Sequence, residues 1–208
     1  MIELVCVRHG RTAWNADLRF QGQTDVPLDA HGSGQALLLA GRLRGTTFDA
    51  AVSSDLARCV ETARIILSFH PQTTLRIDTD LREMAFGDWE GLTWAQIVER
   101  DPKLALDGWS RPKTQAPPGG ELFDDVVRRA ARAVAAIQAV LPRGGRVLVV
   151  THAGVLHALL RVILGDDEGG KIEIRFTPAG LSRFAIGADG VGSILGLNEV
   201  AEAGSLER

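Results

Sequence analysis

Cysteine is scarce in this chain, with two among 208 residues. Cys6 lies in an apolar stretch and Cys59 in a stretch of helical periodicity, and the pair matches no metal-ligand spacing. We therefore expect both to be small, buried hydrophobic side chains. The default location for a chain with so few cysteines is a reducing cytoplasm.

Long hydrophobic runs are also missing. No stretch approaches the ~20 consecutive apolar residues that span a bilayer. Arg8 interrupts the first apolar run, which is therefore unlike a secretion signal. The formal net charge of −3 leaves no excess of positive charge to neutralise nucleic-acid phosphates. We expect neither a membrane nor a nucleic acid as a partner.

What the sequence does contain is an alternation of strand and helix patterns. Its 45% apolar and 24% charged residues are ordinary for a soluble protein, and its length suits one α/β domain over 1–208. Apolar, β-branched runs predict buried strands at 2–7, 48–54 and 146–151. Helical periodicity predicts helices at 34–44, 55–67, 93–100, 121–141 and 154–164. The order predicts a three-layer α/β/α sandwich with a mostly parallel central sheet.

Local signals refine the ends of these elements. Asp55 is the predicted N-cap of the second helix, and Thr93 and Gln96 have the spacing of a capping box. Near the C-terminus we predict short strands at one sheet edge, at 172–176, 181–186 and 192–197. Two copies could pair through such an edge as a homodimer, although nothing in the sequence requires it.

Polar residues follow the predicted strands at the points where they end. Arg8 and His9 follow the first strand, Arg58 comes about one helical turn after the second, and His152 follows the third. The carboxyl ends of parallel strands meet at one rim of a sheet, where ligands bind in such folds. We therefore expect two arginines and two histidines to converge there.

These residue types suit phosphoryl transfer. Arginine is seldom buried without an anionic partner, and forked guanidiniums can hold the equatorial oxygens of a transferring phosphoryl group. A neutral histidine is a competent nucleophile, and nearby positive charge lowers the pKa of histidine. Glu83 follows a strand-like stretch and could protonate the leaving oxygen. Spacing alone leaves open that Glu83 is a surface acid.

We predict no metal and no cofactor. Asp78 and Asp80 lie one residue apart without further ligands, and His31, His70 and His157 have no partner at ligand spacing. His157 lies on an apolar helix and is expected in the core.

The least regular stretch is 101–120, rich in proline, glycine and polar residues. A loop of this length is usually functional or disordered. A cap over the site and a surface excursion stay open, with Trp109 and Arg111 as the candidate contact residues.

Six ordered motifs carry a resemblance to a known family: RHGRTAWN, RFQGQTDVPL, SSDLARCVETA, LREMAFGDWEGLT, PPGGE and VVTHAGVLHALL. On these motifs the chain resembles the histidine phosphatase superfamily. Within it, the chain is most similar to the branch of cofactor-dependent phosphoglycerate mutases and small bacterial phosphatases such as α-ribazole phosphatase. The resemblance covers nearly the whole chain and implies a phosphoglycerate mutase-like fold.

The resemblance also implies roles for the residues at the rim. His9 would become phosphohistidine, Arg8 and Arg58 would hold the phosphoryl oxygens, His152 would donate a hydrogen bond to them, and Glu83 would protonate the leaving group. Phosphate or substrate contacts are implied at Asn15, Gln21, Gly22 and Ala153.

The sequence departs from the family pattern in three places without removing a catalytic group. Arg11 stands where an acid is common and adds positive charge near the mouth of the site. Ala153 replaces a usual glycine, and Leu122 replaces a frequent serine. Each difference could alter which substrate is accepted.

We predict a hydrolase that acts on a small phosphomonoester. A cofactor-dependent phosphoglycerate mutase is the first alternative, disfavoured because only 101–120 is available as a cap. A non-catalytic phosphate-binding module is the second, disfavoured because binding alone needs only the arginines. The substrate stays open among sugar phosphates, phosphoglycerates, glucosyl-phosphoglycerate and nucleoside phosphates. Trp89 and Trp94 could stack on a sugar or base, or could equally be core residues.

Overall fold

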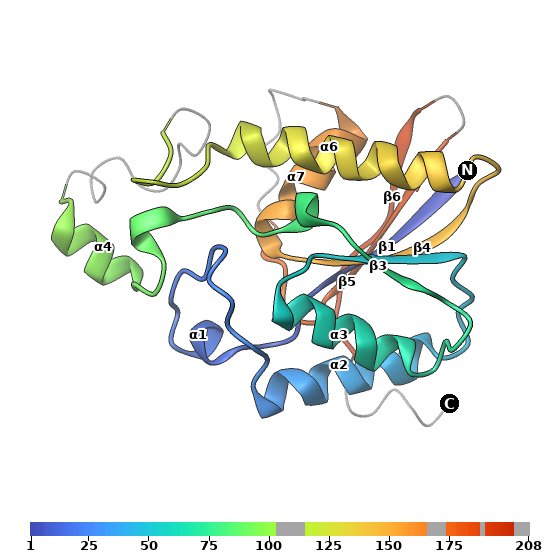
Figure 1. Ribbon diagram of the computed structural model, residues 1–208, viewed down its shortest axis with the longest axis horizontal. Helices are drawn as coiled ribbons and strands as arrows, with labels where there is room; N and C mark the ends of the chain where they lie inside the picture. Colours follow the sequence, from blue (N-terminus) through green and yellow to red (C-terminus); the bar gives the residue numbers. More distant parts are fainter. Residues whose placement is uncertain (103–114, 166–173, 188–189, 202–208) are drawn as a thin grey trace.

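Six strands form one sheet at the centre of the molecule (Figure 1). The computed structural model describes residues 1–102, 115–165, 174–187 and 190–201. The strands are β1 (Ile2–Arg8), β2 (Ala50–Ser53), β3 (Leu75–Ile77), β4 (Gly145–Thr151), β5 (Leu181–Ile186) and β6 (Gly192–Glu199). Their order is β3-β2-β4-β1-β5-β6, in which the first four are mutually parallel and β5 pairs antiparallel with both β1 and β6. The predicted, mostly parallel sheet is confirmed.

Helices cover both faces of the sheet. Helices α2 (Ala30–Leu43) and α3 (Ala57–Leu67) lie on one face, and α6 (Phe123–Val140) and α7 (Ala153–Leu164) on the other (Figure 1). The three-layer sandwich is therefore confirmed. Two short helices, α1 (Ala13–Ala16) and α4 (Trp94–Arg100), lie beyond the carboxyl ends of the parallel strands (Figure 1). Two 3-10 turns, η1 (Thr79–Leu81) and η2 (Gly87–Trp89), follow β3. Among the described helices, none combines the length and the apolar character needed to cross a membrane.

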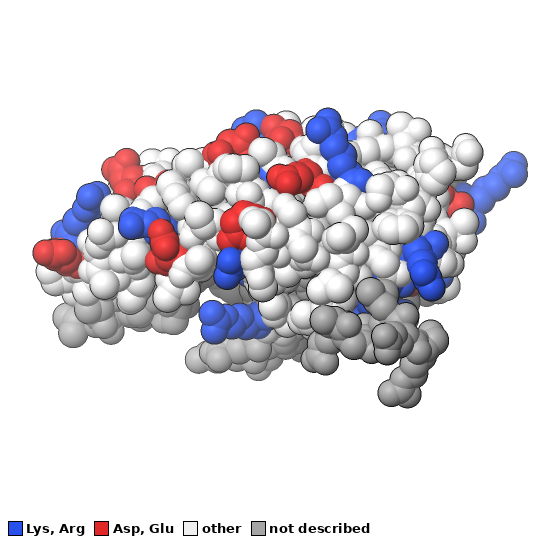
Figure 2. All heavy atoms as spheres, turned by 90° about the horizontal axis from the view of Figure 1, so that it is seen from below, with Lys and Arg blue, Asp and Glu red and all other residues white. Residues whose placement is uncertain are grey.

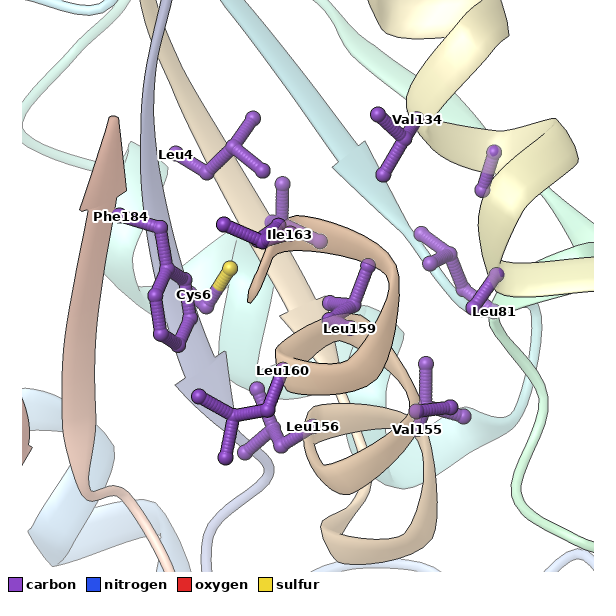
Figure 3. Packing of buried hydrophobic residues seen from close by; sticks show 14 of the residues in the cluster. Leu4, Cys6, Leu81, Val134, Val155, Leu156, Leu159, Leu160, Ile163 and Phe184 are labelled. Atoms are coloured by element: carbon purple, nitrogen blue, oxygen red, sulfur yellow. The ribbon is translucent and has the colours of Figure 1, made fainter. Parts of the chain in front are cut away.

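The alternation of side chains along the strands explains the two layers of core. Leu4 and Cys6 of β1 pack toward α6 and α7, whereas Val5 and Val7 pack toward α2 and α3. Because both faces are buried, the strand sequence is continuously apolar from Leu4 to Val7 instead of alternating. Figure 3 shows Leu4, Cys6 and Phe184 of the sheet beside the apolar side chains of α7. Burial of each leucine, isoleucine, valine or phenylalanine side chain in this core stabilises the fold by about 1.5–3 kcal/mol.

The prediction that Asp55 caps α3 is wrong. The helix begins at Ala57, whose amide donates a 2.7 Å hydrogen bond to the carboxylate of Asp25. Asp55 instead accepts two hydrogen bonds from the Arg82 guanidinium, at 2.8 Å from Nε and 2.5 Å from Nη2. A bidentate, charge-assisted pair is stronger than a single cap contact. The Asp55 carboxylate therefore pairs with Arg82 and does not cap α3.

Other local predictions had mixed outcomes. The capping box of Thr93 and Gln96 at α4 is confirmed, as are the last two C-terminal strands. The strand at 172–176 is wrong for its described part, since 174–176 is not a strand. The carbonyls of Arg175 and Phe176 accept hydrogen bonds from side chains instead of a strand. Of the irregular stretch, 103–114 lies outside the described residues, including Trp109 and Arg111.

The first turn of α2 packs closely against the loop that follows β1. An added Cβ on Gly32 would lie 2.0 Å from the backbone oxygen of Arg11 and 2.6 Å from its nitrogen. A Cβ on Gly10 would lie 2.5 Å from the backbone oxygen of Gly32. Glycine at both positions therefore lets helix and loop meet backbone to backbone.

Two alanine substitutions in α2 should have opposite effects on stability. Gly32→Ala should lower the free energy of unfolding by about 2 kcal/mol, because the clash is with backbone that must shift. Gly34→Ala places its methyl in open space and should raise the free energy of unfolding by about 0.5–1 kcal/mol. Urea unfolding of both variants measures the difference. Equal effects of the two substitutions would contradict this packing.

Candidate active site

Two neighbouring parallel strands bring the two histidines together. In the register of β1 with β4, Arg8 lies opposite Thr151, and the His9 amide donates to the Thr151 carbonyl at 2.9 Å. His9 and His152 are each the first residue after their strand. Their rings lie 5.1 Å apart between centroids, inclined at 60°. The strand register alone thus places both imidazoles at one end of the sheet.

The imidazole of His9 is buried, and its bonding assigns the tautomer. Nδ1 lies 2.7 Å from the carbonyl oxygen of Gly10. A carbonyl only accepts, so Nδ1 carries the proton and Nε2 keeps its lone pair. Burial is the main cause that holds the pKa of His9 well below its usual range, and the charges of Arg8 and Arg58 add to it. The ring is therefore neutral, with its free lone pair on Nε2.

Arg58 of α3 is fully buried and joins three parts of the site. Its Nη2 donates to the Gly22 carbonyl at 2.7 Å, and its Nη1 donates to the Thr24 carbonyl at 2.9 Å. Its Nε donates to Nδ1 of His152 at 3.3 Å. Arg58 and His152 therefore lie together at this end of the sheet, as the sequence predicted.

His152 is also buried and neutral. Its Nδ1 accepts from Arg58, so its Nε2 carries the proton and donates to the Ser54 hydroxyl at 3.0 Å. Burial, followed by the charge of Arg58, holds the pKa of His152 well below its usual range. Both ring nitrogens are thus bonded within the protein.

Arg8 contributes a second guanidinium with an unmet donor. Its Nη1 donates to the Phe176 carbonyl at 2.6 Å. Its Nε is buried and has no hydrogen-bond partner among the described residues. A buried, unpaired donor is unfavourable, and an anionic oxygen bound beside it would satisfy it.

Glu83 is buried and lies at the N-terminus of α7. Its Oε1 accepts hydrogen bonds from the amides of Met84, at 2.9 Å, and Gly154, at 3.1 Å. Gly154 is the second residue of α7, where the helix dipole favours negative charge. A Cβ at Gly154 would lie 2.3 Å from Oε1, so the glycine makes room for the carboxylate. The alternative that Glu83 is a surface acid is wrong.

The comparison with known families agrees with this arrangement. Residues 4–199 match the family model of the histidine phosphatase superfamily, branch 1. The chain belongs to the histidine phosphatase superfamily. The resemblance expected from the six motifs is confirmed.

Several relatives within the superfamily carry functional names. A glucosyl-3-phosphoglycerate phosphatase of Mycobacterium tuberculosis is 39% identical over 168 residues, covering 77% of this chain and 74% of that protein. A probable phosphoglycerate mutase of Salmonella choleraesuis is 34% identical over 189 residues, covering 88% of this chain and 85% of that protein. A bifunctional protein of M. tuberculosis is 37% identical over 197 residues, covering 94% of this chain but 53% of its own length. The chain thus spans about half the length of that relative.

Solved structures show the same fold. The mycobacterial glucosyl-3-phosphoglycerate phosphatase in complex with VO3 superimposes with a TM-score of 0.86 at 32% identity. The match covers 96% of this chain and 100% of the other. The histidine phosphatase fold is therefore present in nearly full extent.

The four residues expected to contact substrate lie around this centre. Gly22 accepts from Arg58, and Ala153 begins α7 next to His152. Gln21 is buried, and its Oε1 accepts from the Thr12 hydroxyl at 3.0 Å. The Oδ1 of Asn15 accepts a hydrogen bond from the Thr12 amide in the capping box of α1. Asn15 also lines a cleft together with Arg8. The roles of these residues toward a substrate stay predictions.

Arg129 holds the Glu83 segment in place and was not predicted from the sequence. This α6 residue is buried and donates from Nη1 to the Asp80 carbonyl at 2.8 Å and also to the Arg82 carbonyl. Its Nη2 donates to the Glu83 carbonyl at 3.0 Å, and it pairs with both Glu121 carboxylate oxygens at 3.1 Å. An arginine next to the apolar stripe of α6 was the one sequence signal for this contact.

Glu90 was also missed and has a similar effect on Arg58. Its carboxylate accepts from the amides of Gln23 at 3.0 Å, Thr24 at 2.9 Å and Phe86 at 3.1 Å, and from the Thr24 hydroxyl at 2.5 Å. These bonds hold the loop whose carbonyls accept from Arg58. Glu90 therefore positions the arginine through the backbone of that loop.

Other sequence expectations can be placed around the site. Arg11 is not an unpaired charge at the mouth, since its Nε donates to Asp29 at 2.8 Å. Trp89 and Trp94 pack on Phe20, with centroids 6.2 and 6.4 Å apart. Within the described residues, no three His, Cys, Asp or Glu side chains are grouped so as to hold a metal ion.

Two buried, neutral histidines should make stability depend on pH. The unfolded chain protonates histidine near pH 6.5, whereas the lowered pKa values keep His9 and His152 neutral in the folded state. The unfolded state then binds more protons as pH falls below 6.5, so the free energy of unfolding decreases. The slope should reach at most about 1.4 kcal/mol per pH unit for each histidine. His70, whose pKa burial also lowers, contributes in the same direction.

Urea unfolding between pH 7.5 and 5.5 measures this slope. The variant His152→Asn should remove one histidine's share of it. His31→Asn, which changes an exposed residue of α2, is the matched control and should keep the wild-type slope. A wild-type stability that does not fall over this interval would contradict the neutral, buried state of the pair.

Proposed function

We propose that the chain is a metal-independent phosphatase that hydrolyses a small phosphomonoester through a phosphohistidine on Nε2 of His9. One observation carries the proposal: a buried, neutral imidazole with a free Nε2 lone pair lies beside two arginines. Such a site attracts a phosphoryl dianion and offers it a nucleophile. The phosphatase names of relatives at 39% and 32% identity support the same chemistry.

In the first step, the Nε2 lone pair of His9 attacks phosphorus. The N–P bond forms and the bond between phosphorus and the ester oxygen breaks, while the leaving oxygen takes a proton from the carboxylic acid of Glu83. The Nδ1 proton stays on its bond to the Gly10 carbonyl, which favours the positive charge that develops on the ring. Arg8 and Arg58 hold the phosphoryl oxygens throughout.

In the second step, water attacks the phosphohistidine. Glu83, now a carboxylate, accepts a proton from the water as the O–P bond forms and the N–P bond breaks. The electron pair returns to Nε2 of His9, and inorganic phosphate leaves. The cycle regenerates the neutral histidine and the protonated acid, so no further reactant is needed.

A mutase is the second candidate, favoured by one relative named a probable phosphoglycerate mutase. It would return the phosphoryl group to a second hydroxyl instead of to water. A non-catalytic phosphate-binding module is the third. A module that only binds phosphate would need neither the free lone pair on His9 nor a carboxylate at the start of α7.

The test follows phosphate release from a panel of phosphomonoesters with a chelator present. We expect release to survive the chelator and to fall by at least ~10³-fold in His9→Ala, because the covalent route is lost. Rapid acid-free quenching should trap acid-labile phosphate on the wild type alone. Isomerisation of 3-phosphoglycerate with a bisphosphoglycerate primer, faster than any hydrolysis, would instead establish the mutase. Phosphate binding without either reaction would establish the binding module.

The proton-donor role of Glu83 predicts a dependence on the leaving group. Glu83→Gln should lower kcat/KM about 10²-fold for glycerol 3-phosphate, whose alkoxide needs a proton. The loss should be much smaller for p-nitrophenyl phosphate, because nitrophenolate leaves without one. Equal losses for both esters would contradict the role.

Arg129→Lys should reproduce this pattern more weakly, because one ammonium cannot make all the contacts of the guanidinium. We expect about a tenfold loss for glycerol 3-phosphate and a smaller one for p-nitrophenyl phosphate. A residue that affects only folding would lower both rates equally. Arg128→Lys, at the neighbouring exposed position of α6, is the matched control and should leave both rates unchanged.

A further inference from the structure

A cleft opens beside the phosphate site, with Arg8 in its wall. Its volume is about 490 Å³, which falls within the range of sites for small molecules. The α1 segment contributes Trp14, Asn15 and Arg19, and the segment before β5 contributes Arg175 and Phe176. Arg8 belongs both to this lining and to the phosphate site, so the two adjoin at this residue.

The charge of the cleft is one-sided. Three of its lining residues are arginines and none is acidic. On one face of the described residues, by contrast, acidic and basic side chains are interspersed (Figure 2). The concentration of positive charge in the cleft is therefore a local feature and does not reflect the net charge of −3.

Arg175 is the arginine most available to a ligand. It is exposed, and its side chain has no ion pair or hydrogen bond with the described residues. Its charge lies close enough to Arg8 to contribute to lowering the pKa of that residue. Two guanidiniums that repel each other in the free protein would both be stabilised by an anion bound between them.

The backbone that carries Arg175 is anchored. Its carbonyl accepts from Nδ2 of Asn198 at 2.9 Å, and the Thr177 amide donates to Oδ1 of the same asparagine at 2.7 Å. The carbonyl of Phe176 accepts from Arg8. The segment is thus fixed both to β6 and to the phosphate site, so Arg175 extends from a defined position.

Arg19 is the second positively charged residue that could bind a ligand in the cleft. Its Nη1 donates to the Gly91 carbonyl at 2.7 Å, and its Nε lies 3.5 Å from an Asp17 carboxylate oxygen. Because this ion pair is exposed to solvent, it is weak and can give way to a ligand anion. Trp14 and Leu18 add apolar surface for the carbon skeleton of a ligand.

We propose that Arg175 and Arg19 form a subsite for a second anionic group, a carboxylate, so that the substrate is a phosphorylated carboxylic acid. The inference rests on the proposed phosphatase function and specifies its substrate class. A carboxylate accepts charge-assisted hydrogen bonds from guanidiniums, whereas an uncharged sugar or nucleoside gains little from them. An ammonium group in the same position would be repelled.

The test compares two esters that differ in one group. 3-Phosphoglycerate carries a carboxylate where glycerol 3-phosphate carries a hydroxymethyl group. The wild type should have the higher kcat/KM for 3-phosphoglycerate. Arg175→Gln should lower that value about tenfold, mainly through KM, and change the value for glycerol 3-phosphate less than about twofold. Higher ionic strength should weaken the preference, because salt screens exposed charges.

Two further variants complete the design. Arg19→Gln with Arg175→Gln should abolish the preference, and thermal unfolding checks that the double variant is folded. Arg44→Gln is the matched control, because Arg44 is exposed and follows the far end of α2 from the site. It should keep both rates.

The outcomes separate this inference from the proposed function. Hydrolysis of both esters with equal efficiency, or a preference unchanged in the double variant, would overturn the carboxylate subsite while the phosphatase stands. If neither ester nor p-nitrophenyl phosphate is hydrolysed, the phosphatase proposal fails. Calorimetric binding to the His9→Ala protein then decides the subsite: tighter binding of 3-phosphoglycerate than of glycerol 3-phosphate, lost in Arg175→Gln, supports it, and equal binding rejects it.

Discussion

The burial of the Arg58 guanidinium is the constraint on which the site depends. A charged group removed from water is strongly unfavourable unless its donors are satisfied. Here two backbone carbonyls and one imidazole nitrogen accept from it. Those carbonyls face inward because the Glu90 carboxylate binds the backbone amides of the same loop. One buried charge thus fixes the start of α3, the loop after α1 and the ring of His152.

The same charge contributes to the protonation state of the two histidines. With Arg8 it adds to the effect of burial and keeps both rings neutral. His9 consequently keeps a lone pair, and His152 can accept from Arg58. The arginines are not neutralised by the histidines, and Arg8 retains a buried donor without a partner among the described residues. The site is therefore complementary to an anion that can be attacked, which is the electrostatic requirement of phosphoryl transfer.

The centre of this site was predictable from sequence because the sheet register determines it. Arg8, His9 and His152 follow buried strands directly, and parallel neighbours place such residues at one end. Arg129 and Glu90 were not predictable in this way, because their partners are backbone groups brought near only by the complete fold. Asp55 illustrates the limit in the other direction. Aspartate before a helix favours an N-cap, but the Asp55 carboxylate forms a stronger, bidentate contact with Arg82, which is distant in sequence.

The residues that would carry out the chemistry and those that would select the substrate lie on different parts of the fold. The strand-end residues are fixed by pairing along β1 and β4, whereas the cleft is built from a short helix and an irregular segment before β5. Substitutions in those two segments can change the groups that meet a ligand while the histidines keep their places. The separation is incomplete, because Arg8 bonds to the Phe176 carbonyl. A shift of that segment would therefore move Arg8, an arginine of the phosphate site. Recognition of the rest of the substrate and binding of its phosphate are thus coupled through the Arg8 guanidinium.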